Sequence, residues 1–285
     1  MKRFLLNTAH FTCYLVAANI LCFLANKAFY YDVYTGFNPN FETYLVADSH
    51  GHSLDTLPQQ YGIYNFSDPS DSYEDMLRKV KYIIANSEVK KILISADDHT
   101  LTTYREKNNN LDRSAVYATS EDYQSAYQYF SERYLKRYIP LVHGKSRDAL
   151  LMNIKLLWSN TSNKKTLWAD ATDAYRRSRA SIRSKIHYGD SERSEKMEEF
   201  LEEIIKVCQS NNVEIQGIKF PLSPEYLQAV ECKGFATEEV FEKYGVEVLD
   251  FRNSLSLPQD FRDQDHVSVR GGLKFLPMLK KAMDP

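Results

Sequence analysis

The stretch Phe41-Glu-Thr-Tyr-Leu-Val-Ala-Asp48-Ser49-His50-Gly51-His52-Ser53 indicates both the fold and the place of its chemistry. Its first half is apolar and of strand length, and it stops abruptly on small, acidic and imidazole side chains. In α/β proteins, ligands bind at the carboxyl ends of the strands, which is where such residues lie. A second acidic and histidine group, Asp263-Gln-Asp-His266, lies near the C-terminus. One fold could therefore bring a nucleophile, an acid and a base together.

Apolar runs of strand length alternate with helical patterns along much of the chain. Residues 71–85 carry apolar side chains at a helical spacing, and Asp71 or Ser72 is placed to cap that helix. Strand, helix and strand in this order imply a parallel sheet. We expect an α/β protein, a three-layer α/β/α flavodoxin-like sandwich with a central parallel sheet. The expected strands are 44–47, 62–66, 89–96, 213–220 and 246–251, and further helices are expected at 192–209, 224–231 and 273–283.

The strand signal disappears between about residues 100 and 188, where Tyr-rich and then Arg-rich sequence takes over. A connection of this length is too long for an ordinary loop. We therefore expect a helical insertion above the strand ends. Its Arg-rich part, 176–185, predicts either a site for phosphate head groups or an anionic glycan, or a solvated helix face.

The N-terminal segment Phe4 to Ala25 contains no charged side chain and is flanked by Lys2, Arg3 and Lys27. At about 1.5 Å per residue it is long enough to cross roughly 30 Å of hydrocarbon. We expect an uncleaved membrane anchor, with a cleaved signal segment or a buried helix as the alternatives. The positive-inside rule then places the N-terminus in the cytoplasm and the rest of the chain in the periplasm or exterior.

The bulk composition is typical of one catalytic-size domain. The chain has 285 residues and nearly balanced charge, with 36 Lys and Arg against 38 Asp and Glu. Such a balance supplies no field that would attract nucleic acid, so a nucleic-acid partner is disfavoured. We expect a membrane anchor or signal segment at 1–28, a linker at 29–40, and one α/β/α domain at 41–285 with the insertion at about 100–188.

The acidic and histidine groups predict serine chemistry. A serine hydroxyl is a weak nucleophile at neutral pH, so Ser49 needs an imidazole to take its proton and a carboxylate to orient that imidazole. Asp263 and His266, spaced D-x-x-H, can supply both from one turn, with Nδ1 bound to the carboxylate and Nε2 facing the serine. Each residue also has a structural alternative: Ser49 as a helix cap, His266 as a structural histidine, and Asp263 as a turn residue.

These motifs resemble the SGNH hydrolase superfamily, also called GDSL-type esterases, and in particular its membrane-anchored bacterial members linked to polysaccharide or cell-wall acyl transfer. Ala47-Asp48-Ser49 is similar to the Gly-Asp-Ser that ends a strand in that family. The run from Asp263 to Val267, followed by Gly271 and Gly272, fits its closing motif. The resemblance implies that Ser49 is the nucleophile, His266 the general base and then acid, and Asp263 the residue that orients His266, without a cofactor or a metal.

The sequence departs from the family pattern where oxyanion donors are expected. Ala47 replaces a glycine, Asp68-Pro-Ser70 stands where a glycine amide commonly serves, and Ala96-Asp-Asp-His99 replaces Gly-x-Asn-Asp. The loss of one oxyanion donor is typically worth ~10²–10³ in rate. The resemblance implies oxyanion or substrate contacts from Asp48, Ser67, Ser70, Asp98 and His99, and substrate-contact or supporting roles for His50 and His52.

Two other functions fit parts of the same sequence. Asp48-x-His50, Asp68-x-x-Asp71 and Asp97-Asp98-His99 look like a loose calcineurin-like metallophosphoesterase pattern, in which Asp and His hold two metals. That pattern lacks Gly-Asn-His and a later Gly-His-x-His, and it leaves Asp263 and His266 unused. The second alternative is a non-catalytic SGNH-like scaffold of a membrane acylation complex.

The expected function is serine-dependent acyl-ester chemistry outside the cytoplasm. The resemblance implies O-acetyl transfer to, or ester hydrolysis on, a polysaccharide or cell-wall glycan. It also implies two kinds of partner: an acylated glycan or other ester as the substrate, and a polytopic membrane acyl-transfer protein as the donor. Hydrolysis and transfer share a covalent intermediate and differ in how well water is excluded, so the sequence does not separate them.

Overall fold

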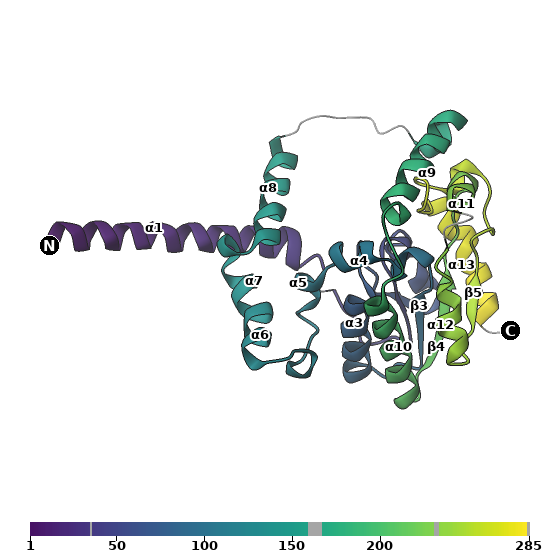
Figure 1. The fold of residues 1–285 in the computed structure, drawn as a ribbon, viewed down its shortest axis with the longest axis horizontal. Helices are drawn as coiled ribbons and strands as arrows, with labels where there is room; N and C mark the ends of the chain where they lie inside the picture. The colour runs from purple at the N-terminus through teal and green to yellow at the C-terminus, as the bar shows by residue number, and fades with distance from the viewer. Residues whose placement is uncertain (35, 159–166, 231–233, 284–285) are drawn as a thin grey trace. The chain divides into compact units, whose positions relative to one another are not determined.

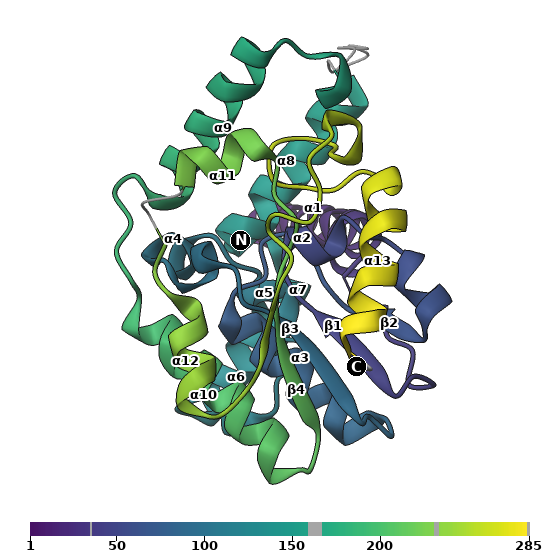
Figure 2. The same cartoon turned by 90° about the vertical axis from the view of Figure 1, so that its right-hand side faces the viewer.

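A five-stranded parallel sheet is the centre of the structure, a computed structural model that describes residues 1–34, 36–158, 167–230 and 234–283. The strands lie in the order β2-β1-β3-β4-β5, and each neighbouring pair is parallel (Figure 2). This is the flavodoxin-like order. The five predicted strands and the predicted fold class are confirmed. The strands are β1 Thr43–Val46, β2 Ile63–Asn65, β3 Lys91–Ser95, β4 Glu214–Lys219 and β5 Val248–Asp250.

Helices cover both faces of the sheet, which is why its central strands β1 and β3 are largely apolar and buried. Figure 2 shows α3 (Tyr73–Asn86), α10 (Glu195–Ser210) and α12 (Thr237–Lys243) on one side and α13 (Val269–Met283) on the other. Phe275, Leu276 and Leu279 of α13 join one buried cluster with Leu45, Leu93 and Ile218 from three strands. The three layers therefore hold the strand ends in fixed positions.

The start of α3 follows the predicted capping, with Ser72 as the capping residue. The Ser72 hydroxyl accepts from the Asp75 backbone N–H, and the Asp75 carboxylate accepts from the Ser72 backbone N–H at 2.9 Å. This reciprocal pair is a capping box. Asp71, the other predicted cap, instead accepts a hydrogen bond at 2.7 Å from Lys79, which is fully buried and also contacts Asp68 at 2.8 Å. The segment after β2 is thus tied to α3.

The chain divides into two compact units, Met1–Gly36 with Leu111–Asn163, and Phe37–Asn110 with Lys164–Pro285. Much of the predicted insertion, 100–188, therefore lies in a unit with the N-terminal helix, whereas α9 (Asp173–Tyr188) belongs with the sheet. The predicted linker, 29–40, is shared between the units: Tyr31 and Tyr34 are buried in the first, and Phe37 stacks on Tyr44 in the second at 5.9 Å between ring centroids.

The first unit is built on α1 (Lys2–Asn26), which continues as a π-helical turn over Lys27–Tyr31. The Asn26 side chain donates to the Ser146 carbonyl at 2.9 Å, so α8 (Gly144–Trp158) packs on the C-terminal end of α1 (Figure 1). Within the described ranges, Lys2–Tyr31 is the one helix long and apolar enough to cross a bilayer, and an 18-residue window within it has a mean hydropathy of 1.6. A membrane anchor and a signal segment both meet that description.

Short helices complete both units. Those in the sheet-containing unit are α2 Ser49–His52, α4 Thr103–Lys107 and α11 Pro224–Val230, with 3-10 turns at Leu57–Tyr61, Asp98–Leu101, Trp168–Asp170 and Pro258–Asp260. Those in the unit with α1 are α5 Leu111–Ser114, α6 Ala126–Phe130 and α7 Lys136–Tyr138, with 3-10 turns at Ser120–Asp122 and Pro140–Val142 and a π-helical turn at Ser131–Leu135.

Candidate active site

Ser49 lies where β1 gives way to α2, at the carboxyl edge of the sheet. It is half-buried, and it is not the residue that caps α2. Asp48 does this, because its carboxylate accepts from the His50 backbone N–H at 3.0 Å. The structural alternative for Ser49, a capping role, is therefore filled by its neighbour.

Gly51 allows α2 to lie close to the next strand end. A Cβ at this position would come 2.5 Å from the Ser67 hydroxyl oxygen and 2.8 Å from the Ala47 Cβ. The Ser67 hydroxyl in turn accepts from the Ala47 backbone N–H at 3.0 Å and donates to the Leu45 carbonyl at 3.4 Å. Ser67 thus joins β1 to the segment after β2.

Asp48 is a buried anion held by two cationic or polar side chains. Its carboxylate accepts from Arg105 and from His99 Nε2, the latter at 2.7 Å. Burial alone would raise the pKa of Asp48, but Arg105 and His99 outweigh it and hold that pKa well below its ordinary value. For His99 burial wins over the attraction of Asp48 and lowers the pKa. His99 is therefore a neutral imidazole that donates to Asp48 at neutral pH.

Asp263 and His266 form a hydrogen-bonded pair within one turn. Asp263 Oδ1 lies 2.7 Å from His266 Nδ1 and also accepts from the His266 backbone N–H at 3.0 Å. An antiparallel bridge between Phe261 and Val267 closes the turn. Within the described part of the chain, His266 Nε2 is buried and has no hydrogen-bond partner. The imidazole is thus fixed in orientation, with one nitrogen unused.

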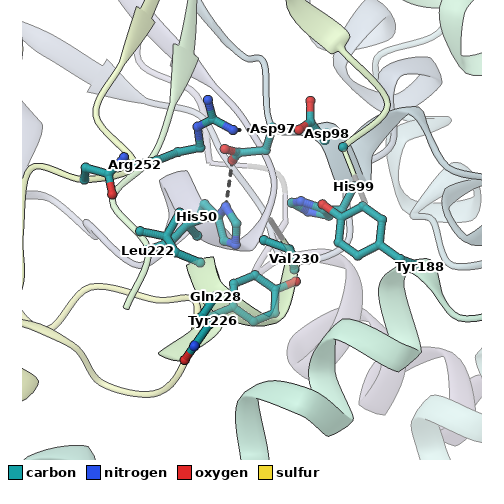
Figure 3. Close-up of a pocket in the computed structure, with 13 residues that line it drawn as sticks. His50, Asp97, Asp98, His99, Tyr188, Leu222, Tyr226, Gln228, Val230 and Arg252 are labelled. Carbon is teal, nitrogen blue, oxygen red and sulfur yellow. Dashed lines mark hydrogen bonds and ion pairs between the residues drawn. The ribbon is translucent and has the colours of Figure 1, made fainter. Parts of the chain in front are cut away.

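His50 and Asp97 form a second pair of the same kind. His50 Nδ1 lies 2.7 Å from Asp97 Oδ2, and both side chains are buried (Figure 3). His50 Nε2 also lacks a hydrogen-bond partner among the described residues, and it lies 3.8 Å from Asp265 Oδ2. Burial lowers the pKa of His50, but Asp97 and Asp48 outweigh it and raise that pKa well above its ordinary value. The sequence placed both residues at strand ends and grouped them in the metallophosphoesterase-like pattern, but it did not predict this pairing.

Asp265 connects the two pairs. It is 1% exposed, its Oδ2 accepts from Arg183 Nε at 2.7 Å, and its Oδ1 lies 3.2 Å from His266 Nδ1. Burial would raise the pKa of Asp265, but His266, His50 and Arg183 hold it well below its ordinary value. Burial likewise lowers the pKa of His266, but Asp265 and Asp263 outweigh it and raise that pKa.

The Arg-rich segment places two of its side chains against acidic partners. Arg183 contacts Asp265, and Arg176 donates to Glu225 of α11 at 2.7 Å. Both arginines lie on α9, which packs on α11. These two side chains therefore form internal ion pairs, whereas Arg177 and Arg179 are exposed as the solvated-face alternative expects.

The two predicted parts of the site meet at one edge of the sheet. The ring of His50, the residue after Ser49, lies 5.4 Å from the ring of His266 between centroids. Over the described residues, however, no hydrogen bond joins the Ser49 hydroxyl to His266 Nε2. The structure therefore brings the two stretches together and leaves the serine–histidine contact unformed.

A cavity of about 370 Å³ opens beside these pairs. Strand-end residues His50, Asp97 and His99 line one part of it, and Tyr188 and Tyr226 line another (Figure 3). Neither Ser49 nor His266 is among the lining residues. The cavity thus offers carboxylates, imidazoles and phenol rings to a ligand. Its other lining residues are Asp98, Leu222, Leu227, Gln228, Val230, Gly234, Arg252 and Asn253.

The residues expected at the oxyanion position are largely engaged elsewhere. The Ser67 hydroxyl donates to a strand carbonyl, and His99 Nε2 faces Asp48. Asp98 accepts from Lys219 at 3.1 Å and from the Thr237 backbone N–H at 3.2 Å. Ser70 lies in the left-handed region with φ 73°. Asp98 and His99 still line the cavity, which leaves substrate contact as their expected role.

Comparisons with known proteins find similarity at the level of solved structures. No family model and no curated protein matches the sequence. A GDSL-like lipase from Bacteroides thetaiotaomicron aligns with a TM-score of 0.45 and 7% identity, over 91% of this chain and 98% of that chain. A protein from Bacteroides fragilis assigned as an acylhydrolase aligns with a TM-score of 0.41 and 7% identity, over 91% of this chain and 96% of that chain. At these values the chemistry of the site has to be argued from its own residues.

Proposed function

We propose that the sheet-containing unit performs acyl-ester chemistry with Ser49 as the nucleophile. One observation carries this proposal: Asp263 holds His266 by Nδ1 and leaves Nε2 buried and unused, beside the residue that follows Ser49. An imidazole oriented by a carboxylate is what a serine needs in order to lose its proton.

In the proposed reaction the Ser49 hydroxyl attacks the ester carbonyl and gives its proton to His266 Nε2. The tetrahedral intermediate then expels the alcohol, which takes the proton back from His266, and leaves an acyl group on Ser49. Asp263 and Asp265 stabilise the imidazolium formed in between, because both raise the pKa of His266 once burial has lowered it. The step requires Ser49 Oγ to come within ~2.6–3.2 Å of His266 Nε2 when substrate binds.

The proposed oxyanion donor is the backbone N–H of Ser49. The amide is present whatever side chains surround it, and it lies at the start of α2. Because the Ser67 and His99 donors already face protein acceptors, the intermediate depends on fewer side-chain donors than the resemblance implies. A turnover slower by ~10²–10³ is the expected consequence of each donor lost.

We propose an acylated polysaccharide or cell-wall glycan as the substrate, with either water or a sugar hydroxyl as the acyl acceptor. Tyr188 and Tyr226 in the cavity wall support a sugar ligand, since phenol rings present an apolar face and a polar tip. An apolar helix at Lys2–Tyr31 supports a membrane anchor. We propose that the sheet-containing unit lies outside the cytoplasm, as the flanking charges predict, and that a polytopic acyl-transfer protein is its partner.

A second candidate function is metal-dependent phosphoester hydrolysis. It is favoured by one observation: Asp48, His50 and His99 each offer a ligand atom, and these atoms lie within 4.8 Å of one another. Against it, Asp68 and Asp71 of the expected pattern contact Lys79. Arg105 also donates to the Asp48 carboxylate, which would have to bind the metal.

Hydrolysis of a chromogenic acetyl ester, with and without chelator, separates the two functions. Serine chemistry predicts activity that persists in chelator and is lost in Ser49→Ala. Phosphoesterase activity that chelator abolishes and Ser49→Ala retains would reverse the order of the candidates. If no ester hydrolysis, phosphoester hydrolysis or acyl transfer is found, and Ser49→Ala leaves the cellular phenotype intact, the non-catalytic scaffold is the remaining candidate.

A further inference from the structure

We propose that His50, Asp265 and His266 form a binding site for one divalent transition-metal ion, with Zn²⁺ as the probe. Each residue offers one ligand atom, and the three atoms lie within 4.8 Å of one another. The inference goes beyond the proposed acyl chemistry, which uses His266 Nε2 but gives no role to His50 Nε2.

The spacing of the ligand atoms suits an ion of this class. Two ligands bound at about 2.1 Å on a tetrahedral ion lie roughly 3.4 Å apart. His50 Nε2 and Asp265 Oδ2 are 3.8 Å apart, which is beyond hydrogen-bond reach and close to the spacing of two ligands on one ion. A shift of a few tenths of an ångström closes the difference.

Two buried nitrogens in this cluster have no hydrogen-bond partner. They are Nε2 of His50 and Nε2 of His266, counted over the part of the chain that the structure describes. The two side chains are 2% and 7% exposed, respectively. A buried polar atom that is left unsatisfied costs free energy, and metal coordination satisfies such a nitrogen.

Both imidazoles are held as metal-binding histidines usually are. His50 Nδ1 lies 2.7 Å from Asp97 Oδ2, and His266 Nδ1 lies 2.7 Å from Asp263 Oδ1. A histidine ligand almost always donates its other ring N–H to a carboxylate, a backbone carbonyl or water, which fixes the tautomer and makes Nε2 a better ligand. Two imidazoles held in this way lie beside the Asp265 carboxylate, which indicates that all three side chains could bind one ion.

The charges around His50 also favour a cation. Asp97 accepts from His50, from the Phe220 backbone N–H at 3.1 Å and from the Ser95 hydroxyl at 3.3 Å. In the described ranges it has no lysine or arginine within 4.0 Å, so its negative charge is balanced through the imidazole.

The ligand set selects a class of ion. Two imidazoles and one carboxylate suit Zn²⁺ and related transition metals, whereas Mg²⁺ and Ca²⁺ prefer sites made of oxygen ligands. Asp265 is held in place by its neighbours: Oδ2 accepts from Arg183, and Oδ1 accepts from Gln264 Nε2 at 2.9 Å and lies 3.2 Å from His266 Nδ1. His50 lines the 370 Å³ cavity, which gives the ion a route into the cluster.

Metal binding and the proposed ester chemistry compete for one atom. An ion bound at His266 Nε2 would occupy the nitrogen that accepts the Ser49 proton in the proposed mechanism. Zn²⁺ is therefore expected to inhibit ester hydrolysis, and removing the ion is expected to restore it.

Titration calorimetry of the untagged full-length chain with Zn²⁺, and metal content after dialysis, test the site. We expect one ion per chain, and at least a tenfold weaker Kd in both His50→Gln and Asp265→Asn. Asp97→Asn is expected to weaken binding 10–100-fold, the usual effect of losing such an orienting carboxylate. Mg²⁺ is expected not to displace the ion.

Control variants separate this site from the catalytic proposal. His52→Gln changes an exposed histidine two residues from His50 and is expected to bind Zn²⁺ as the unchanged protein does. Ser49→Ala is expected to lose ester hydrolysis and keep Zn²⁺ binding. Circular dichroism selects the variants that fold. The site is refuted if Zn²⁺ fails to bind, or if folded His50→Gln and folded Asp265→Asn bind it as tightly as the unchanged protein.

Discussion

Asp263 Oδ1 lies 2.7 Å from Nδ1 of His266, three residues further along the chain. The same carboxylate oxygen accepts from the His266 backbone N–H, so one turn fixes both the backbone and the ring. Because Nδ1 is bound to the carboxylate, the neutral ring carries its proton there and presents a lone pair at Nε2. That lone pair is what the proposed mechanism requires.

Asp263→Asn tests whether this orientation matters for catalysis. An amide that donates to Nδ1 favours the tautomer with the proton on Nε2, which cannot accept from Ser49. Loss of the orienting carboxylate in a serine triad lowers kcat by roughly 10⁴-fold, and we expect a fall of about 10³–10⁴. Steady-state hydrolysis of a chromogenic ester measures it. The matched control is Glu88→Gln, which changes an exposed carboxylate before β3, at the opposite edge of the sheet, and should change kcat less than about twofold. Equal rates for Asp263→Asn and the unchanged protein would rule out the pair as catalytic.

The pH dependence of ester hydrolysis should report the pKa of His266. Asp265 and Asp263 raise this pKa above its ordinary value once the opposing effect of burial is counted. A general base must be deprotonated, so kcat/KM should rise with pH through a midpoint above ~6.5, the ordinary histidine value. Asp263→Asn should move the midpoint to lower pH. A pH profile that is flat, or one that rises only below pH ~6, would contradict this assignment.

The raised pKa of His266 also makes the stability of the fold depend on pH. The pKa of His266 is higher in the folded state, so its contribution to the free energy of unfolding is present below the unfolded pKa and is lost as pH rises through the folded pKa. Asp48 behaves in the opposite sense, because its folded pKa is lowered, and its contribution is lost as pH falls through that pKa.

Arg105→Ala should destabilise the sheet-containing unit. Asp48 is buried and holds its negative charge against Arg105 and His99, so removing the guanidinium leaves a buried carboxylate with a weaker partner. Breaking a buried ion pair typically costs about 3–5 kcal/mol. Urea unfolding at pH 7 measures the loss, and Arg177→Ala on an exposed position of α9 should change stability by less than about 0.5 kcal/mol. If both variants unfold at the same urea concentration, Asp48 does not depend on Arg105.

Gly51→Ala should destabilise the turn that presents Ser49. The added Cβ would lie 2.5 Å from the Ser67 hydroxyl oxygen and 2.8 Å from the Ala47 Cβ. Overpacking of this kind typically costs about 1–3 kcal/mol. The double variant Gly51→Ala with Ser67→Ala removes the closer contact, and it should lose less stability than the sum of the single changes. Strict additivity in thermal unfolding would show that Ser67 is not what limits the space at Gly51.

The sheet was predictable because its signals are local. Five apolar runs gave the five strands, and the run from 71 to 85 gave α3 with its cap at Ser72. The alternation of strand and helix predicted that the strands are parallel. The D-x-x-H spacing likewise predicted the contact between Asp263 and His266, since both residues belong to one turn.

The remainder depends on contacts between distant residues that no local pattern contains. Arg183 reaches Asp265 from a position 82 residues away, and His50 meets Asp97 from 47 residues away. The predicted insertion is divided between the two units for the same reason, because a contact between distant residues decides it. Asn26 donates to Ser146, 120 residues further along, so that part of the chain packs with the N-terminal helix.

Mass spectrometry of the protein after incubation with a fluorophosphonate tests the serine mechanism most directly. Such a reagent traps a serine whose hydroxyl is activated by a base. The account predicts one phosphonyl adduct, on the peptide that contains Ser49, and at least a hundredfold slower labelling in His266→Gln. An adduct on another residue, or ester hydrolysis that continues while Ser49 stays unlabelled, would contradict it.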